Sequence, residues 1–391
     1  MRSDVVAIDR VNNLAREGAL TAASAFERLS GEPVRVASTD LEVIQRARLD
    51  RRYETSEYVG AHASFSGPTD GTAVFAMARS DASTIASSVG TDSDGPNPVF
   101  ASIGPVVADG FGEVITATTG SMGDLAAPTS VDTYRARMIP ESAKHDEWLV
   151  TLTTEFKLPD DAVRLEIVLV PDAGVLSTAG GSRGQVTSVA ERLSTIGELT
   201  EAGAETAAEH VSRMTGLDAS VTVRGITFAE IKSMMDDLEP GLAVGTVIEI
   251  EETSNGYFAL LFDERAATTV ADAVLPDMIG DSPIWAGMGQ SAISEIGNVI
   301  TSGFIDGWSD AMDGTLAHSP PYFVADDRIA LISSLSPEVS VEEIAGFMVD
   351  TEITLGGGSV DGTFHGVPTR DGLNLALNQL MFQPLQGEQD A

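Results

Sequence analysis

The chain repeats one sequence pattern at an interval of 182 to 185 residues, and this repeat limits the folds that are open to it. Each copy begins with an alanine-rich amphipathic stretch, continues with an apolar strand that leads into another helix, and later shows a further helical segment. A constant interval at three landmarks is not expected by chance and indicates two copies of one structural unit. The paired landmarks are residues 9–29 and 194–214, 71–85 and 256–270, and 112–116 and 294–298.

The length of 391 residues fits two domains of about 200 residues each. Between the two copies lies a small, polar, glycine-containing stretch, residues 177–184, which is typical of a flexible linker. We therefore predict a first domain over residues 1–176, a linker over residues 177–190 and a second domain over residues 191–391.

The order of the expected elements predicts an α+β fold. Each copy reads as helix, strands, helix, strands, without the regular strand–helix alternation of a parallel sheet. Residues 194–210 and 291–308 form two helices of related pattern, so we expect each domain to be a pseudo-symmetric pair of halves, with long helices packed on an antiparallel-rich sheet. The strand candidates are residues 155–158, 164–170, 245–251, 258–262, 329–334 and 373–382.

The charge balance is strongly acidic. The chain has 59 acidic and 23 basic residues, only three of them lysines, and a formal net charge of −36. The acidic residues are spread along the whole chain, and such an excess fits a cell interior with molar salt, where the screening length falls to about 3 Å. We therefore expect a halophilic source. Because the chain has no basic stripe, we expect no nucleic-acid partner.

Composition also excludes several other classes. The chain has no cysteine, which removes disulfides, thiolate metal sites and a cysteine nucleophile. It has no run of about 18 apolar residues of the kind that a membrane-spanning helix needs, and its first residues lack the hydrophobic run of a signal peptide. The five histidines are scattered without the spacing of metal ligands. We expect a cytoplasmic protein with no membrane insertion and no metal site.

The most informative segment runs over residues 290–304. Its large apolar side chains recur at helical spacing and predict one buried stripe, formed by Ile293, Ile296, Ile300 and Phe304. Ser291, Glu295 and Asn298 form a polar stripe roughly opposite. Glu295 and Asn298 are three residues apart, so they are neighbours on the outer face of the helix. The helix is thus expected to bury one side and to present a carboxylate beside an amide on the other.

This segment resembles the signature of the CheC, CheX and FliY phosphatases of prokaryotic chemotaxis. That signature is Asp or Ser, three residues, Glu, two residues, Asn, and then Pro after 22 further residues. The chain meets every spacing with Ser291, Glu295, Asn298 and Pro321. The repeats also resemble CheC, so the resemblance covers nearly the whole chain. It implies two tandem CheC-like domains and dephosphorylation of a phosphorylated CheY-type response regulator.

The resemblance further implies a role for each residue. Asn298 would orient the water that attacks the aspartyl phosphate, since an amide offers both an acceptor oxygen and an NH2 donor. Glu295 would contact the lysine in the regulator's own active site, and Pro321 would shape the chain after the helix. Mg2+ would come with the regulator, so we expect no cofactor of the chain's own. The family also binds CheD, a receptor-modifying deamidase, which is therefore a second expected partner.

Three other helices occupy positions where the resemblance places further sites, and each departs from the pattern. In the helix that contains Ser194, the glutamate is kept as Glu198, but Glu201 takes the asparagine position and Arg224 takes the proline position. A carboxylate at the asparagine position would repel a phosphoryl group that carries about two negative charges.

The first copy departs from the pattern at both of its helices. Asn13 and Arg16 stand at the glutamate and asparagine positions of the first helix, and an arginine has no acceptor for a water proton. In the second helix Glu113 is kept, but Thr116 stands at the asparagine position with a shorter reach. We therefore expect one active site in four, located in the second copy.

Other interpretations remain open. Glu295 and Asn298 fit two solvated polar residues on an amphipathic helix, and the glutamates near Glu198 fit a solvated acidic face. Trp285 and Trp308 are expected to pack in the core or at an interface. The degenerate sites also fit a non-catalytic adaptor that binds CheD or links CheY to the motor. A structural flagellar switch component, as in the FliM and FliY relatives, is less expected, because no regulator-binding peptide or C-terminal extension domain is evident.

Overall fold

The computed structural model describes most of the chain. The described residues are 7–55, 57–66, 70–89, 97–119, 129–132, 138–140, 147–171, 188–231, 234–235, 238, 240–250, 256–276, 283–284, 286–311, 317–335 and 345–368. They divide into two compact units. The N-terminal unit comprises Val6–Thr195, and the C-terminal unit comprises Ile196–Ala391 together with Met1–Val5. Most of the predicted linker, residues 177–190, lies outside the described residues, so the predicted domain boundaries stay a prediction.

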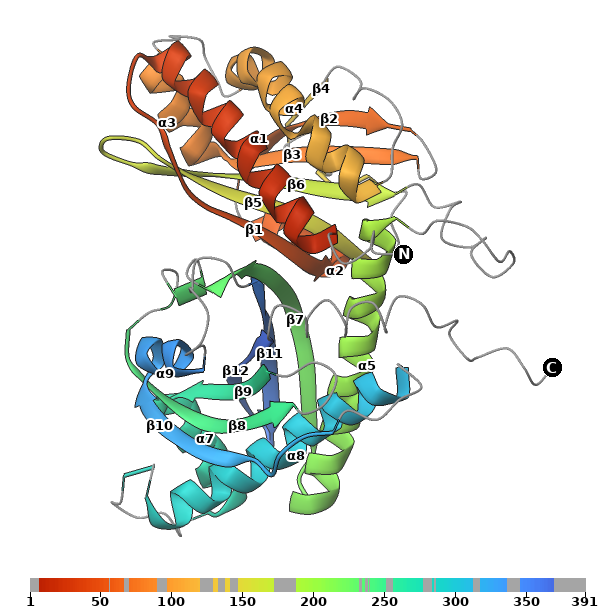
Figure 1. The fold of residues 1–391 in the computed structure, drawn as a ribbon, viewed down its shortest axis with the longest axis vertical. Helices are drawn as coiled ribbons and strands as arrows, with labels where there is room; N and C mark the ends of the chain where they lie inside the picture. Colours follow the sequence, from red (N-terminus) through yellow and green to blue (C-terminus); the bar gives the residue numbers. More distant parts are fainter. Residues whose placement is uncertain are drawn as a thin grey trace, which may run out of the picture. The chain divides into compact units, whose positions relative to one another are not determined.

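The N-terminal unit is a six-stranded sheet with helices on it, as far as the described residues go (Figure 1). The strand order is β1-β5-β6-β3-β2-β4, and every neighbouring pair is antiparallel. Its elements in chain order are α1 (Ala7–Ser30), β1 (Arg35–Gln45), α2 (Arg46–Thr55), β2 (Tyr58–Phe65), β3 (Gly71–Ala78), α3 (Arg79–Val89), α4 (Asn97–Thr119), β4 (Thr129–Asp132), β5 (Trp148–Lys157) and β6 (Ala162–Pro171).

The C-terminal unit repeats this plan. Its described strands follow the order β7-β11-β12-β9-β8-β10, again with every neighbouring pair antiparallel. Its elements are α5 (Val189–Thr215, whose first residues belong to the N-terminal unit), β7 (Ala219–Glu230), β8 (Leu242–Ile250), β9 (Gly256–Asp263), α7 (Glu264–Val274), α8 (Gly287–Ala311), β10 (Tyr322–Asp327), α9 (Arg328–Ser334), β11 (Ala345–Leu355) and β12 (Gly358–Pro368).

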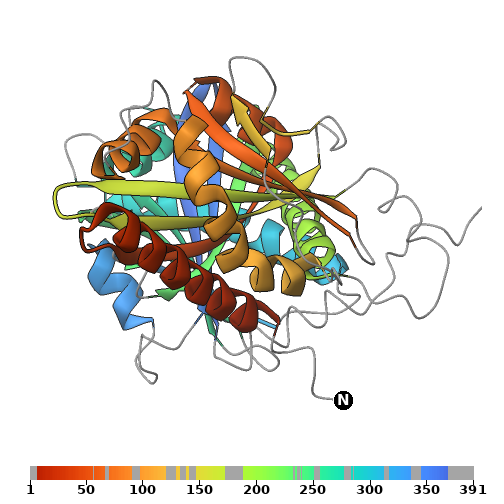
Figure 2. The same ribbon diagram turned by 90° about the horizontal axis from the view of Figure 1, so that it is seen from above.

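The strand orders confirm the α+β class and the pseudo-symmetric halves. Numbered within its own unit, each sheet has the order 1-5-6-3-2-4. Exchanging the first three strands for the last three reproduces the same order in reverse, which is the mark of an internal two-fold relation. The two long helices of each unit, α1 with α4 and α5 with α8, begin corresponding halves. Figures 1 and 2 show α1 and α4 together on one face of their sheet.

One predicted strand is a helix. Residues 329–334 belong to α9, whose first turn is capped by Asp327: its carboxylate accepts hydrogen bonds from the backbone N–H groups of Ile329 and Ala330. Leu331 and Ile332 then pack into the core. A short apolar run has no clear period, so the cap and the packing decide its structure. The strand candidate at residues 373–382 lies outside the described residues, and the other four lie within β5, β6, β8 and β9, apart from end residues.

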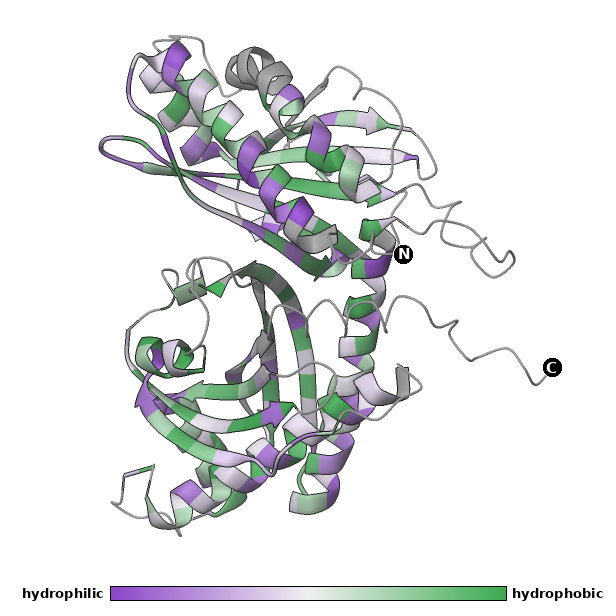
Figure 3. Cartoon of the chain, viewed as in Figure 1, coloured by the Kyte–Doolittle hydropathy of each residue, from purple (hydrophilic) through white to green (hydrophobic). Residues whose placement is uncertain are grey.

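Both faces of the C-terminal sheet are buried, which explains its continuous apolar strands. Along β9, Phe258, Leu260 and Phe262 face one side, while Ala259 and Leu261 face the other, where they pack with α9. The ring of Phe364 on β12 contacts Phe258 of β9 and also Phe304 of α8. Helix α8 therefore lies on the side of the sheet opposite α9. Figure 3 shows the apolar colour along the strands and the mixed colour along the helices.

His365 is a buried titratable group on the α9 side of this sheet. It is 3% exposed, and it lies beside Ala259 and Met348 in the registers of β9 and β11. Burial and, to a smaller extent, the positive charge of Arg328 together lower the pKa of its imidazole to about 4. The folded protein therefore holds His365 neutral at pH values where the unfolded chain binds a proton.

We predict that this histidine makes the unfolding free energy depend on pH. Above pH 6.5 it is neutral in both states, and below that value only the unfolded chain takes up the proton, until the folded pKa of about 4 is reached. Stability is therefore lost as the pH falls through this window, by about 3 kcal/mol in total from this group. Urea denaturation at about pH 7 and about pH 5 should show a smaller loss for His365→Gln than for the native protein. Equal losses would contradict the assignment.

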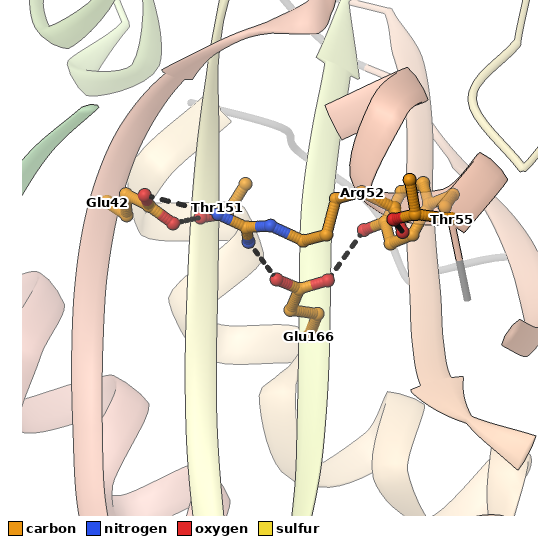
Figure 4. A network of polar contacts seen from close by, with 6 residues as sticks. Glu42, Arg52, Thr55, Thr151 and Glu166 are labelled. Atoms are coloured by element: carbon orange, nitrogen blue, oxygen red, sulfur yellow. Dashed lines mark hydrogen bonds and ion pairs between the residues drawn. The ribbon is translucent and has the colours of Figure 1, made fainter. Parts of the chain in front are cut away.

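In the N-terminal unit, a network of charged and polar side chains connects α2 to the sheet (Figure 4). Arg52 donates to Glu166 on β6 and lies 3.5 Å from Glu42 on β1, and Tyr53 Oη donates to Glu166 Oε2 at 2.8 Å. Thr151 on β5 donates to Glu42 at 3.4 Å. Burial raises the pKa of Glu42, although the charge of Arg52 acts to lower it. Each carboxylate is thus compensated by donors from elements far apart in the chain.

Glu166→Gln is expected to lower the unfolding free energy of the N-terminal unit by about 2 kcal/mol, because it leaves the largely buried Arg52 with a single carboxylate. The control is Glu155→Gln, which breaks the pair between Glu155 and Arg164, whose side chain is 61% exposed. An exposed pair of this kind contributes about 0.5 kcal/mol. Chemical denaturation of both variants measures the difference, and equal effects would show that the network adds nothing beyond a surface pair.

Candidate functional site

Helix α8 begins after a hydrogen-bonded turn, and it buries one stripe of apolar side chains. Gly287 has φ of +59°, a conformation that favours glycine, and the preceding Ala286 N–H donates to the carbonyl of Pro283. The apolar side chains of the stripe are 0–1% exposed. These residues are the predicted ones, Ile293, Ile296, Ile300 and Phe304. This burial fixes which side of α8 faces outward.

The polar stripe lies on that outward side, as the spacing predicted. Glu295 and Ser291 are exposed, and Asn298 is partly exposed. The Ser291 hydroxyl donates to the carbonyl of Gly287 at 3.2 Å, so it is engaged within its own helix. In the part of the chain that the structure describes, no hydrogen bond or ion pair holds the side chains of Glu295 and Asn298. A carboxylate and an amide therefore stand next to each other on a helix surface, available to a partner.

Pro321 is connected to α8 indirectly, through strands of the sheet on which α8 packs. It directly precedes β10, which pairs with β8, and α8 contacts both strands. The chain before Pro321 is tied to the end of β8, because Ser319 and Glu249 exchange hydrogen bonds. Pro321 thus marks the start of the strand that adjoins α8, and the structural role expected for it stays a prediction.

Helix α8 also crosses α5 at close range. A Cβ placed on Gly303 would lie 2.5 Å from the Cα of Ala207, and one placed on Gly307 would lie 2.5 Å from the Cα of Gly203. Only glycine allows two helix backbones to approach so closely. Near the end of α8, the partly exposed Trp308 packs in a cluster of aromatic rings with Phe258, Phe304 and Phe347, in keeping with the core or interface packing expected for it. Trp285 lies outside the described residues.

On α5, the residues aligned with Glu295 and Asn298 lie on the outer side of the helix, but their side chains have a different chemistry. Glu198 is exposed and Glu201 is partly exposed on the outer side of α5. Arg224, which takes the proline position, lies on β7, and its guanidinium contacts Asp361 at 2.6 Å and Glu352 at 3.6 Å. This arginine is engaged by carboxylates on neighbouring strands. On α1 of the N-terminal unit, Asn13 and Arg16 are both exposed.

The helix crossing in the N-terminal unit shows that α4 was aligned in the wrong register. A Cβ placed on Gly18 of α1 would lie 2.6 Å from the carbonyl oxygen of Gly110 and 3.1 Å from the ring of Phe111. A Cβ placed on its repeat partner Gly203 would lie 3.2 Å from the Cα of Phe304 and 3.5 Å from its ring. Gly110 and Phe111 therefore correspond to Gly303 and Phe304, an interval of 193 residues instead of 182.

In this register, Glu113 and Thr116 correspond to Asp306 and Ser309, beyond the candidate site. The positions of Glu295 and Asn298 are occupied by Ser102 and Pro105, within Ser102-Ile-Gly-Pro105 against Glu295-Ile-Gly-Asn298. The same interval pairs Pro128, just before β4, with Pro321, just before β10. The sequence-based alignment missed this because it assumed one constant interval. A shared Ile-Gly pair and a shared Gly-Phe pair were the available signals.

Two absences are limited to the described residues. No three histidine, aspartate or glutamate side chains there are grouped so that they could hold a metal ion. Among the same residues, no helix combines the length and the hydropathy needed to cross a bilayer.

Comparison with known proteins identifies the family. The model of the CheC-like family matches residues 288–324, a segment that contains Glu295, Asn298 and Pro321. A curated protein of Halobacterium salinarum, named "Putative CheY-P phosphatase CheC1", is 32% identical over 133 residues, which cover 34% of this chain and 68% of that protein. The chain belongs to the CheC-like family.

Two solved structures are similar to parts of this chain. FliY of Thermotoga maritima is 20% identical and aligns over 49% of this chain and 96% of its own, with a TM-score of 0.42. CheX of Desulfovibrio desulfuricans is 17% identical and aligns over 44% of this chain and 99% of its own, with a TM-score of 0.29.

Proposed function

We propose that this CheC-like protein is a phosphatase that removes the phosphoryl group from a phosphorylated CheY-type response regulator. The observation that carries the proposal is the pair formed by Glu295 and Asn298, side by side on the outward face of α8 and unengaged within the described residues. The printed name of the Halobacterium salinarum relative supports the same activity and substrate. We further propose that the protein works in the cytoplasm of a halophile, in line with its charge and with the source of that relative.

The proposed reaction is hydrolysis of an aspartyl phosphate. The oxygen of a water molecule attacks phosphorus, the bond from phosphorus to the aspartate oxygen breaks, and the products are free phosphate and the aspartate carboxylate. Such transfers depend on positioning and on stabilising developing charge. Asn298 supplies a side-chain oxygen that accepts a hydrogen bond from the water and an NH2 group that donates nearby. Glu295, three residues away on the same face, pairs with a lysine of the regulator and so docks the helix.

The positive charge for the reaction comes from the partner in this proposal. Residues 196–391 contain 32 acidic and 6 basic residues, against 26 and 16 in residues 6–195. Helix α8 contains no lysine or arginine at all. The regulator's own lysine and Mg2+ would therefore neutralise the phosphoryl oxygens.

Asn298→Ala is expected to abolish most acceleration of dephosphorylation, by a factor of about 100, because no other group on α8 replaces the amide. Glu295→Ala should mainly raise KM, since it removes a docking contact. The matched control is Glu113→Ala, an exposed glutamate on α4 that the corrected register places outside any site. Release of phosphate from a phosphorylated CheY-type regulator with Mg2+ measures all three variants.

This experiment has two contradicting results. If the native protein does not accelerate loss of phosphate, it is not a phosphatase for that regulator. If Glu113→Ala lowers the rate as much as Asn298→Ala does, the assignment of the site to α8 is wrong.

The charge distribution predicts that activity rises with salt. A phosphorylated partner approaches a unit with an excess of 26 negative charges, so its association is slowed by repulsion at low ionic strength. At about 0.1 M salt the screening length is about 10 Å, and near 1 M it is about 3 Å. The apparent kcat/KM should increase severalfold between these conditions, with circular dichroism confirming that the protein is folded in both. A maximum at low salt would contradict the prediction.

A second candidate function is that of an adaptor. It is favoured by one observation: none of the remaining long helices carries both a glutamate and an asparagine at the positions that correspond to Glu295 and Asn298. In this version the protein binds CheD, or links CheY to the motor, without hydrolysis. Pull-down with CheD and with motor components separates the candidates, because the adaptor retains its partners in the Asn298→Ala variant and shows no phosphate release in the native form.

A further inference from the structure

Three glycines in residues 297–307 of α8 lie at close contacts with two different neighbours. Gly303 and Gly307 face α5, whereas Gly297 faces the sheet. Gly297 stands between Glu295 and Asn298 in the chain, in the turn that presents both of them. The contact made by Gly297 therefore lies directly beneath the candidate site.

Gly297 rests on Thr246 of β8 without room for a side chain. A Cβ on Gly297 would lie 2.4 Å from the Thr246 hydroxyl oxygen, 2.7 Å from its methyl carbon and 3.1 Å from its Cβ. By contrast, a Cβ on Gly112 of α4 would meet no atom within 4 Å. Gly297 is therefore required by its surroundings and not by backbone conformation, since it sits in regular helix.

Thr246 is held rigidly in the core. It is 2% exposed, and within the described residues its hydroxyl is buried without a hydrogen-bond partner. The hydroxyl of Thr301, one turn after Gly297 in α8, is buried in the same state. Buried threonines of other helices, such as Thr118 and Thr200, donate to the carbonyl four residues earlier. Two unpaired buried hydroxyls, one on β8 under Gly297 and one on α8 itself, are costly, and such departures from local rules concentrate at functional sites.

We propose that Gly297 and Thr246 are positioning residues for the phosphatase site. Their contact sets how deeply the turn carrying Glu295 and Asn298 sits on the sheet, relative to β10 and Pro321. A partner domain is wider than one helix, so it rests on these neighbours as well as on α8. The height of the turn then determines the distance between the Asn298 amide and the phosphoryl group. This inference rests on the proposed function.

Gly297→Ala tests the proposal. The added methyl lifts or rotates the turn, and a displacement near 1 Å can reduce catalysis about a hundredfold. We expect kcat for phosphate release to fall by about tenfold to a hundredfold, with a smaller change in KM, because Glu295 still reaches the regulator. In the double variant Gly297→Ala with Thr246→Ala, the two closest atoms are removed, and most of kcat should return. Recovery by a second substitution at the contact is not expected from general destabilisation.

Two control variants accompany this test. One examines the unpaired hydroxyl of Thr246, and the other examines a helical glycine away from the site. Thr246→Val keeps the shape of the contact but removes the unpaired hydroxyl, so it should raise the melting temperature. Gly112→Ala, in an open helical position of α4, should leave kcat unchanged. If Gly297→Ala retains full kcat, or if the folded double variant recovers none of it, the proposal is overturned.

Melting temperatures distinguish failure of this inference from failure of the proposed function. If the native protein releases no phosphate, but Thr246→Ala restores the melting temperature lost in Gly297→Ala, the contact is structural and its catalytic role is rejected together with the phosphatase assignment. If the native protein is active and Gly297→Ala is equally active, only the positioning role is rejected.

Discussion

Burial of one stripe of α8 on the sheet is the constraint on which the site depends. Ile293, Ile296, Ile300 and Phe304 are almost fully buried, so the helix has one allowed rotation. Glycine contacts with α5 and with β8 fix its distance from its neighbours. A carboxylate and an amide three residues apart then face outward on a rigid element. A site made of two side chains can work only when its support is defined this closely.

The repeated fold provides a long helix packed on a sheet several times, but the chemistry of the site depends on a few residues of one helix. Each unit has two long helices on one sheet, and the strand order returns on itself in both. At the positions of Glu295 and Asn298, the other helices carry a glutamate pair, an asparagine with an arginine, and a serine with a proline. Fold alone therefore does not predict activity in each half. Both units pack a short helix on the sheet through apolar contacts, α2 in one and α9 in the other, and the N-terminal unit adds the Arg52 network.

The sequence was sufficient to predict the repeated α+β plan and the outward face of α8, because both follow from periodicity. It was insufficient where tertiary contacts decide. Residues 329–334 look like a strand, yet the Asp327 cap and the packing of Leu331 make them a helix. The connection before α4 spans residues 90–96 and the one before α8 spans residues 275–286, so the repeat interval changes there, and Glu113 was aligned with the wrong position. The helix crossing at Gly18, together with the shared Ile-Gly and Gly-Phe pairs, shows the correct register.

The central claim is that the amide of Asn298 directs water onto a phosphoryl group bound at α8. Asn298→Asp tests it most directly, because it preserves size and replaces only the NH2 group by an oxygen that carries negative charge. The measurement is single-turnover loss of phosphate from a phosphorylated CheY-type regulator in high salt with Mg2+. The account predicts a rate at least about tenfold below that of the native protein, since the new charge repels the phosphoryl oxygens. A native rate with aspartate at this position would contradict it.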